Sequence, residues 1–166
     1  KILIKLKNLK KKKIIKSIGF SSRDPLDAAK ILNKYRFDFL QVGFSVFDQR
    51  VISSGLLKKI KTKNIYLITR SPFNSGFLTK KANKNFFNEK LIKKIKHFRK
   101  THEKDICFLN KSFEYSALKY CISFKNIVSV IVGMQSKLQI AKNVRVVYQN
   151  TKKEKIWKLK LEKINE

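Results

Sequence analysis

The chain alternates short, nearly continuous apolar runs with longer stretches in which apolar residues recur at helical spacing. Apolar runs at 37–44, 65–68 and 127–132 have the length and composition of strands, and the run at 37–44 is typical of a strand covered on both faces. An earlier run at 14–18 leads into Gly19 and predicts one more strand. Strands that alternate with helices predict a parallel sheet, because each crossover returns the chain to the same end of the sheet.

The helix that follows the first predicted strand has a clear start. Asp24 is a favoured N-cap, and Pro25 suits the first helical position. Its expected buried face is Leu26, Ala29, Ile31 and Leu32. Further helices are predicted at 51–60, 91–98, 113–124 and from Ser136 onward, with the tail of a helix at 2–9, a long loop at 74–88 and a final helix at 151–164.

Four βα units of this kind fit either a doubly wound sheet or half of an eight-stranded barrel, and periodicity leaves both open. In both architectures ligands bind at the carboxyl ends of the strands. The residues at those ends are therefore the first candidates for a site. They are residues 19–22, 41–44, 69–72 and 133–136.

Lysine dominates the charge of the chain. The net charge is +29, yet only six of the 40 basic residues are Arg. The lysines are spread through every segment, whereas nucleic-acid binding proteins gather basic residues on one face. The pattern favours solvated lysines on ordinary surfaces. A protein that binds nucleic acid or another polyanion stays as the alternative.

The cysteines and histidines indicate neither a disulfide framework nor a metal site. Cys107 and Cys121 are too few for a framework and fit a reducing cytoplasm, where we expect the protein. His97 and His102 lie in a Lys-rich helical stretch without thiol or carboxylate companions, so both are expected at the surface. No apolar run reaches the roughly 18 residues of a membrane span, so none is expected.

Five segments, taken in order, resemble segments of the aldo/keto reductases. The segment IGFSS at 18–22 resembles the family's IGVSN. The segment FDFLQV at 37–42 resembles a strand of the family that contains an Asp and ends in a Gln, and RSPFNSGFLT at 70–79 resembles the family's SPLAxGxLT. Residues 116–133 resemble the helix and strand that close the family's barrel, and 139–143 its EQxxEN stretch. The resemblance spans about residues 1–145. It implies an α/β fold that is the C-terminal half of a (β/α)8 TIM barrel: four parallel βα units, plus a C-terminal helix. Residues 1–166 would then be a single partial domain.

The resemblance implies a binding site for NADP, as NADPH, at the strand ends. Ser21 and Ser22 occupy the Ser-Asn pair that holds the nicotinamide carboxamide, with Ser22 departing from Asn. Gln41 occupies the Gln that binds the same group, and a Gln side chain offers both donors and an acceptor. Arg70 stands where many members have an aromatic residue that stacks on the nicotinamide, and a guanidinium also stacks or pairs with phosphate.

Two other segments complete the implied cofactor site. Ser71 and Phe73 line the loop on the pyrophosphate side. The segment that the family uses for the adenosine 2′-phosphate and adenine supplies Gly133, Gln135, Ser136, Gln139 and Asn143. The helix start at Ser136 favours an anion whatever the family, because its N–H groups and dipole point there. NADPH rather than NADH is the family expectation.

The family transfers a hydride between nicotinamide and the carbonyl of a sugar, aldehyde or ketone. Its catalytic Tyr, Lys, Asp and His lie on strands one to four, so we assign no catalytic residue in this chain. None of the tyrosines stands in the family's catalytic context: Tyr35, Tyr66, Tyr115, Tyr120 and Tyr148. We expect this segment by itself to bind cofactor weakly and to show little reductase activity.

A half barrel leaves its terminal strands, here 14–18 and 127–132, as unpaired apolar edges. We expect them to pair with a missing N-terminal half, with another chain or with a second copy. Two other readings stay open. One is a degenerate half barrel that binds polyanions without catalysis. The other is a doubly wound domain of unrelated function, although no Gly-rich GxGxxG loop follows a strand.

Overall fold

The computed structural model describes residues 1–77, 79, 89–106 and 112–149. Its elements are α1 (Ile2–Lys11), β1 (Gly19–Ser21), α2 (Pro25–Lys34), β2 (Phe39–Gly43), α3 (Arg50–Ser53), α4 (Leu56–Thr62), β3 (Tyr66–Arg70), α5 (Glu89–Ile106), α6 (Phe113–Ile122), β4 (Ile127–Ile131) and α7 (Lys137–Tyr148). The predicted final helix at 151–164 and most of the predicted loop at 74–88 lie outside the described residues.

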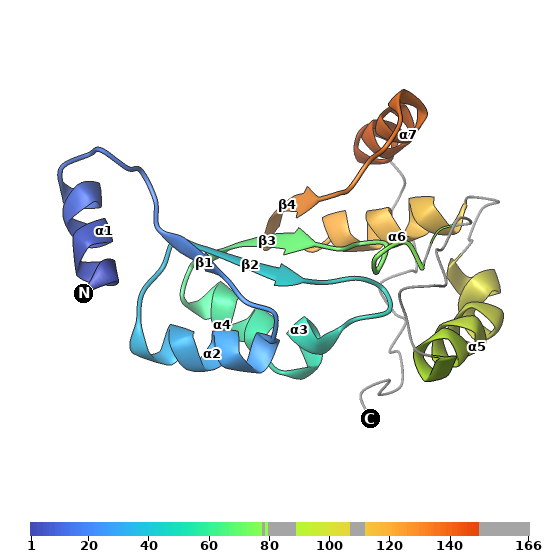
Figure 1. Cartoon of the computed structure of the whole chain (residues 1–166), viewed down its shortest axis with the longest axis horizontal. Coiled ribbons are helices and arrows are strands. Elements are labelled where there is room, and N and C mark those ends of the chain that lie inside the picture. The colour runs from blue at the N-terminus through green and yellow to red at the C-terminus, as the bar shows by residue number, and fades with distance from the viewer. Residues whose placement is uncertain (78, 80–88, 107–111, 150–166) are drawn as a thin grey trace.

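The four strands form one parallel sheet in the order β1-β2-β3-β4. Ser21 stands opposite Gln41, and Arg70 stands opposite both Gly43 on β2 and Ile131 on β4. The carboxyl ends of the strands therefore share one edge of the sheet (Figure 1). The predicted alternation of parallel strands and helices is confirmed.

The first strand begins later than predicted, so the prediction of a strand at 14–18 is wrong. The chain turns at Lys13, whose φ is 60°, and Ile14 is 66% exposed. Only Ile18 of this run is buried, because the residues before it extend past the sheet. β1 starts at Gly19, where an added Cβ would lie 2.8 Å from the carbonyl oxygen of Phe39. The lack of a side chain at Gly19 lets β1 approach β2.

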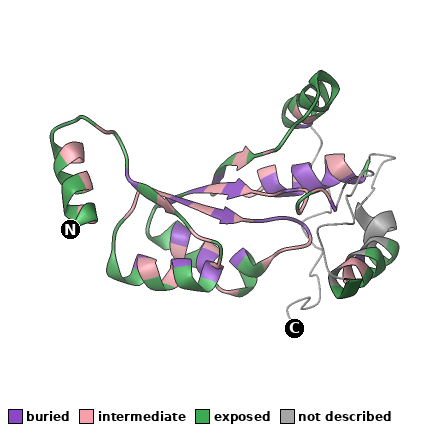
Figure 2. Cartoon of the chain, viewed as in Figure 1, coloured by how far each residue is buried: buried purple, intermediate pink, exposed green. Residues whose placement is uncertain are grey.

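The core lies between one face of the sheet and the helices α2, α4 and α6 (Figures 1 and 2). Leu40 and Val42 of β2 are fully buried on that face, while Phe39 and Gln41 alternate with them and are only partly buried. Within the described part of the chain, β2 is therefore covered on one face, where its apolar run predicted cover on both.

The start of α2 is as predicted, but its buried face is only partly so. The Asp24 side chain accepts a hydrogen bond from the Leu26 N–H at 2.8 Å, and Pro25 follows it in the first turn. Ala28 and Leu32 are fully buried, whereas Leu26 is 55% exposed. Ala29 and Ile31, the other residues predicted for the buried face, are half-buried.

The other helices differ from prediction mainly in their ends. The predicted helix at 51–60 is two helices, α3 and α4, because Gly55 between them takes the left-handed conformation, with φ of 72°. α5 extends beyond its predicted end at 98, and α6 begins at its predicted residue.

Cys121 on α6 is buried, which raises the pKa of its thiol. His97 is exposed as predicted. None of the described helices combines the length and apolar character needed to cross a bilayer.

Asp38, just before β2, fastens α1 to the sheet. Lys10 Nζ donates to both carboxylate oxygens at 2.6 Å, and the Ile18 N–H donates to Oδ2 at 2.7 Å. These bonds, with that from Lys10 the largest cause, hold the pKa of Asp38 below its ordinary value of 3.8 even though partial burial opposes them. The ionised carboxylate is thus favoured in the folded chain.

We predict that Asp38→Asn lowers the melting temperature at neutral pH. A carboxyl group whose pKa is depressed by folding stabilises the folded state above its unfolded pKa and loses that effect as pH falls through the folded value. The difference between the two proteins should therefore shrink below about pH 4. Thermal melts followed by circular dichroism at several pH values test this. The control is Asp27→Asn, which removes a carboxylate from the first turn of α2 together with its exposed ion pair with Lys30. Equal effects of the two substitutions would contradict the role of Asp38.

Candidate functional site

The carboxyl edge of the sheet brings the predicted residues of β1 and β2 into contact. Ser21 Oγ donates to Gln41 Oε1 at 3.0 Å, and the Ser22 N–H donates to the Gln41 carbonyl oxygen at 2.9 Å. With its side-chain oxygen engaged in this way, the Gln41 amide has two N–H donors left for a ligand. The lone pairs of Ser21 Oγ supply acceptors beside them.

Arg70 ties the end of β3 to the loop after β1. Its Nη2 donates to the Ser22 carbonyl oxygen at 3.3 Å, reaching across β2. The Ser22 hydroxyl itself donates to the Asp24 carbonyl oxygen at 2.8 Å and so holds the start of α2. Ser21, Ser22, Gln41 and Arg70 therefore form one hydrogen-bonded group that spans three strands.

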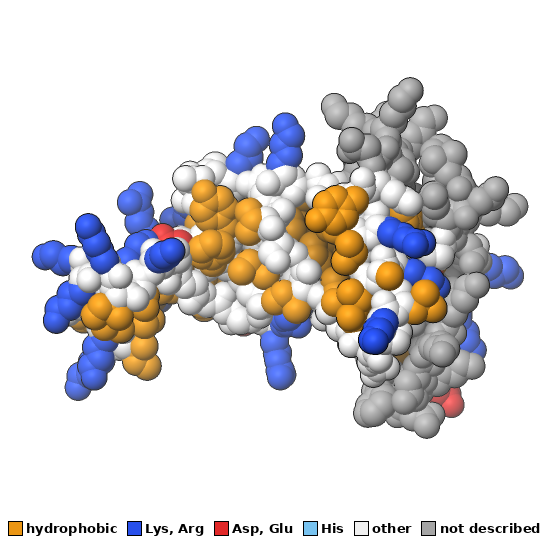
Figure 3. Space-filling view, turned by 90° about the horizontal axis from the view of Figure 1, so that it is seen from above, with side chains coloured by type: hydrophobic (Ala, Val, Ile, Leu, Met, Phe, Trp, Pro, Cys, Tyr) orange, Lys and Arg blue, Asp and Glu red, His pale blue; other side chains and the backbone are white. Residues whose placement is uncertain are grey.

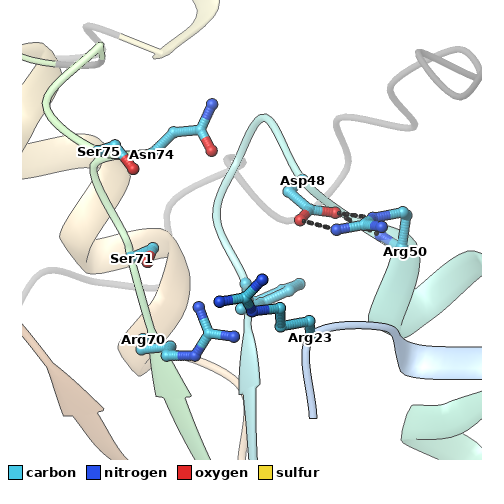
Figure 4. Close-up of a pocket in the computed structure, with 9 residues that line it drawn as sticks. Arg23, Asp48, Arg50, Arg70, Ser71, Asn74 and Ser75 are labelled. Atoms are coloured by element: carbon cyan, nitrogen blue, oxygen red, sulfur yellow. Dashed lines mark hydrogen bonds and ion pairs between the residues drawn. The ribbon is translucent and has the colours of Figure 1, made fainter. Parts of the chain in front are cut away.

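A cleft of about 220 Å³ opens beside this group, between the loops that follow β1, β2 and β3 (Figure 4). Of the predicted residues, Arg70 and Ser71 line it. No sequence motif pointed to the other polar residues of its wall: Arg23, Asp48, Arg50, Asn74 and Ser75. Their sequence signal was position alone, since each follows the end of a strand by two to seven residues.

One pair of charges in the wall is already satisfied. Asp48 accepts from Arg50 Nε and Nη2, both at 2.9 Å, in a two-pronged ion pair. The hydrogen bonding to Asp48 raises the pKa of the Arg50 guanidinium, against the opposing effect of burial. This pair fixes the loop after β2 on one side of the cleft.

The loop after β3 turns sharply on the opposite side of the cleft. Ser71, Asn74, Ser75 and Gly76 all have positive φ, from 48° to 91°. The Asn74 N–H donates to the Ser71 carbonyl oxygen at 2.9 Å, closing the turn. Gly76 ends this run of positive φ values, at 91°. The side chain of Phe73 packs against the hydrophobic core, and Phe73 is not among the residues that line the cleft.

The residues after β4 form an exposed helix start. Ser136 caps α7, its Oγ accepting from the Gln139 N–H at 3.3 Å, and Gln139 Oε1 accepts from the Gln135 N–H at 2.6 Å. This exchange resembles a capping box, and it uses the Gln139 side-chain oxygen within the protein. The predicted helix start at Ser136 is confirmed. Gly133 is exposed, and a Cβ added to it would meet no atom within 4 Å.

Asn143 lies further along α7. It lines a larger, mainly apolar groove of about 420 Å³ between α6, β4 and α7. The predicted residues thus fall into two groups. One is the connected set at the ends of β1 to β3, with the Ser71 loop beside it. The other is the set after β4, which follows the same edge of the sheet because β3 and β4 pair in parallel.

Comparison with known proteins agrees with this architecture. The sequence model of the aldo/keto reductase family matches residues 1–162. The chain belongs to the aldo/keto reductase family. No match was found among curated proteins.

Solved structures of aldo/keto reductases superpose on the chain. The apo form of aldo-keto reductase AKR11C1 from Bacillus halodurans gives a TM-score of 0.73 at 20% identity, covering 90% of this chain and 51% of that one. Its holo form gives 0.70 at 20% identity, covering 86% and 48%. Glycerol dehydrogenase AKR11B4 from Gluconobacter oxydans gives 0.66 at 18% identity, covering 92% and 50%. At these identities the likeness shows the fold, and the chain spans about half the length of these reductases.

The contact between Ser21 and Gln41 depends on how closely β1 approaches β2 at Gly19. We predict that Gly19→Ala lowers the free energy of unfolding by about 1–3 kcal/mol, because the new Cβ would lie 2.8 Å from the Phe39 carbonyl oxygen and 2.9 Å from Phe39 Cβ. Urea unfolding measures this. Gly133→Ala is the matched control, since its added Cβ meets open space. Equal unfolding curves for the two variants would show that β1 can shift freely.

Proposed function

We propose that this chain is the cofactor-binding half of an NADP-dependent aldo/keto reductase, an oxidoreductase that acts on the carbonyl of a sugar, aldehyde or ketone. The observation that carries the proposal is the hydrogen-bonded group of Ser21, Ser22, Gln41 and Arg70 at the carboxyl edge of the sheet. Family membership supports the reaction class, and the two residue groups along the edge support an extended ligand.

The sheet itself supports the half-barrel reading of the fold. Its strands run in chain order, as in a barrel, whereas doubly wound sheets reverse their order at a switch point. Helices cover one face. The other face carries Phe39, Tyr66, Ile68 and Ile131, which are partly or largely exposed among the described residues. Figure 3 shows apolar side chains gathered across the middle of the molecule, with lysines and arginines at its rim. In a closed barrel, layers of side chains fill such a face.

The residues at this edge fit the nicotinamide end of the cofactor. A primary carboxamide needs donors for its oxygen and acceptors for its N–H groups. The Gln41 amide has the donors and Ser21 Oγ the acceptor, because their mutual bond uses only the Gln41 oxygen and the Ser21 proton. We assign Ser21, Ser22 and Gln41 to the carboxamide, and Arg70 and the Ser71–Phe73 backbone to the ring and pyrophosphate.

The residues after β4 fit the other end. Ser136 and the N-terminus of α7 present a hydroxyl and backbone N–H groups to an anion, which suits the adenosine 2′-phosphate of NADP. Gly133, Gln135 and Gln139 shape this start, and we assign Asn143 to adenine. When bound, the nicotinamide would supply or accept the hydride. The residues assigned to the two ends of the cofactor would hold and orient the whole molecule.

No residue of the described chain is assigned to proton transfer. Tyr66 lies at the amino end of β3, the end opposite the site. Tyr120 is buried in the core against Phe44, and burial raises the pKa of its hydroxyl. A proton donor for the carbonyl would therefore come from outside this chain's described residues.

We predict that Gln41→Ala and Ser136→Ala each weaken NADPH binding about five- to tenfold, the effect of losing a hydrogen bond to ligand worth roughly 1 kcal/mol. Ser136→Ala should weaken NADPH more than NADH, because only NADPH carries the 2′-phosphate. Fluorescence titrations with NADPH and with NADH give the dissociation constant of each cofactor. Gln149→Ala, an exposed Gln at the far end of α7, is the control. Unchanged affinity in both test variants would contradict the assigned site.

Among the described residues, β1 and β4 form the two edges of the sheet, which leads us to include association through them in the proposal. We predict that the chain self-associates with rising concentration, and that Val128→Lys, which places a charge on the 49% exposed edge residue, reduces this. Sedimentation velocity measures it. Leu26→Lys adds the same charge at a 55% exposed position on an outer helix and should leave association unchanged. A monomer at all concentrations would refute this part.

A further inference from the structure

The loops that lead into the four strands lie at the amino edge of the sheet, at the end nearer α1 and away from the cleft (Figure 1). Each loop has an exposed cation two or three residues before its strand begins. These cations are Lys16, Arg36, Lys63 and Lys125. Among the described residues, none of the four takes part in an ion pair. The amino edge therefore presents unpaired positive charge, and we call these four residues the cationic row.

The parallel register sets these cations in order across the sheet. Gly19, Phe39 and Tyr66 stand opposite one another in β1, β2 and β3, and each follows a cation of the row by three residues. Hydrogen bonds continue the pairing ahead of the strands, since the Tyr66 N–H donates to the Asp38 carbonyl oxygen at 2.9 Å. Neighbouring strands lie about 4.8 Å apart. The cations thus follow one another in a line across the strands.

Little negative charge opposes the row. Within these four loops, all of which the structure describes, Asp38 is the only acid, and Lys10 already engages it at 2.6 Å. The row is also not needed to offset helix dipoles, because the last turns of α1, α2 and α4 contain lysines of their own. Figure 3 shows basic side chains projecting around the end of the molecule that carries α1. An anionic partner would therefore meet attraction along the whole edge.

An aromatic ring lies beside the row. Tyr35 directly precedes Arg36 and is 49% exposed. Its backbone N–H donates to the Ile31 carbonyl oxygen at 3.0 Å, which fixes the residue at the end of α2. Proteins that bind single-stranded nucleic acid combine cations along the phosphate backbone with rings on which bases stack. A line of cations suits a chain of phosphates, whereas an anionic bilayer presents its charge over a plane.

We propose that the amino edge binds single-stranded nucleic acid, with the cationic row on successive phosphates and Tyr35 stacked on a base. This goes beyond the reductase function and does not depend on it, since the row lies at the edge of the sheet opposite the residues assigned to the cofactor. Contacts to phosphate carry no sequence information. Binding is therefore independent of base sequence and falls steeply with salt.

The first test titrates a fluorescent oligothymidylate of about 20 nucleotides with the full chain and follows anisotropy at several salt concentrations. The logarithm of the association constant should fall against the logarithm of salt with a slope of about −3, because each of four contacts with a single strand contributes about 0.7. The variant Lys16→Gln/Arg36→Gln/Lys63→Gln should bind at least about tenfold more weakly and lose about 2 from the magnitude of the slope.

A matched control removes the same charge elsewhere. The variant Lys58→Gln/Lys142→Gln/Arg145→Gln also loses two lysines and one arginine, all exposed, from α4 and α7. Its affinity should stay within about twofold of that of the unchanged chain, because salt screens distant charges. Equal weakening in the two triple variants would mean attraction to the net charge of +29 and would overturn the row as a site. Circular dichroism confirms that each variant is folded.

A second test separates stacking from charge. Tyr35→Ala should weaken binding of the oligonucleotide about fivefold or more and leave the salt slope unchanged, because the ring is neutral and stacks on a base. Tyr148→Ala is the control, since it removes an 82% exposed ring from the end of α7. If Tyr35→Ala has no more effect than Tyr148→Ala, no base stacks at this edge and the assignment to nucleic acid is overturned.

Two further measurements identify the partner and the edge. Vesicles of phosphatidylserine and phosphatidylcholine should bind more weakly than the oligonucleotide; tighter binding that the row variant loses would assign the row to a membrane surface and overturn the proposal. NADPH should leave the oligonucleotide bound, and displacement would place the strand at the carboxyl edge and also overturn it. A chain that binds the oligonucleotide through the row but does not bind NADPH would overturn the proposed function and leave this inference intact.

Discussion

The close parallel approach of β1 to β2 is the constraint on which the site depends. It requires a residue without a side chain at Gly19, because the Phe39 backbone occupies the place of a Cβ there. The approach brings Ser21 opposite Gln41, and their hydrogen bond then orients both side chains. A strand of only three residues is thereby enough to place its final serine.

The same edge of the sheet carries contributions from loops far apart in sequence. Arg70 contacts the loop after β1, and the turn after β3 faces the Asp48–Arg50 pair from the loop after β2. Parallel strands produce this convergence, because each crossover returns the chain to the amino edge of the sheet. The loops that follow the strands therefore all lie at the carboxyl edge. The helix-covered face meanwhile supplies the stability, with Leu40 and Val42 fully buried. Core residues and residues of the candidate site thus alternate along one strand.

Much of the fold could be predicted from sequence because its signals are local. Apolar runs located β2, β3 and β4, and Asp24 and Ser136 marked two helix starts through capping. The failures arise from tertiary context or, at Gly55, from a left-handed backbone. Residues 14–18 have strand-like composition but extend beyond the sheet, and Gly55 divides a helix that its neighbours favour. The apolar run of β2 could not reveal that one of its faces would be open among the described residues.

The candidate site divides in the same way. Ser21, Gln41 and Arg70 could be found because they end strands and match a family pattern. Arg23 and Asp48 could not, because only the folded loops bring them to the cleft. The periodicity of apolar residues predicts helices and strands but not where loop side chains lie. Phe73 shows the converse, since a position in a matched segment does not fix which way its ring points.

The bond between Arg70 and Ser22 has a mechanical consequence. It links an outer strand of three residues to β3 by a single side chain that passes over β2. Anything that draws the guanidinium away loosens the end of β1, and anything that holds it in place clamps that end. Ligand binding near Arg70 and the order of β1 are therefore thermodynamically coupled. A bound ligand should change the rate of amide hydrogen exchange in β1.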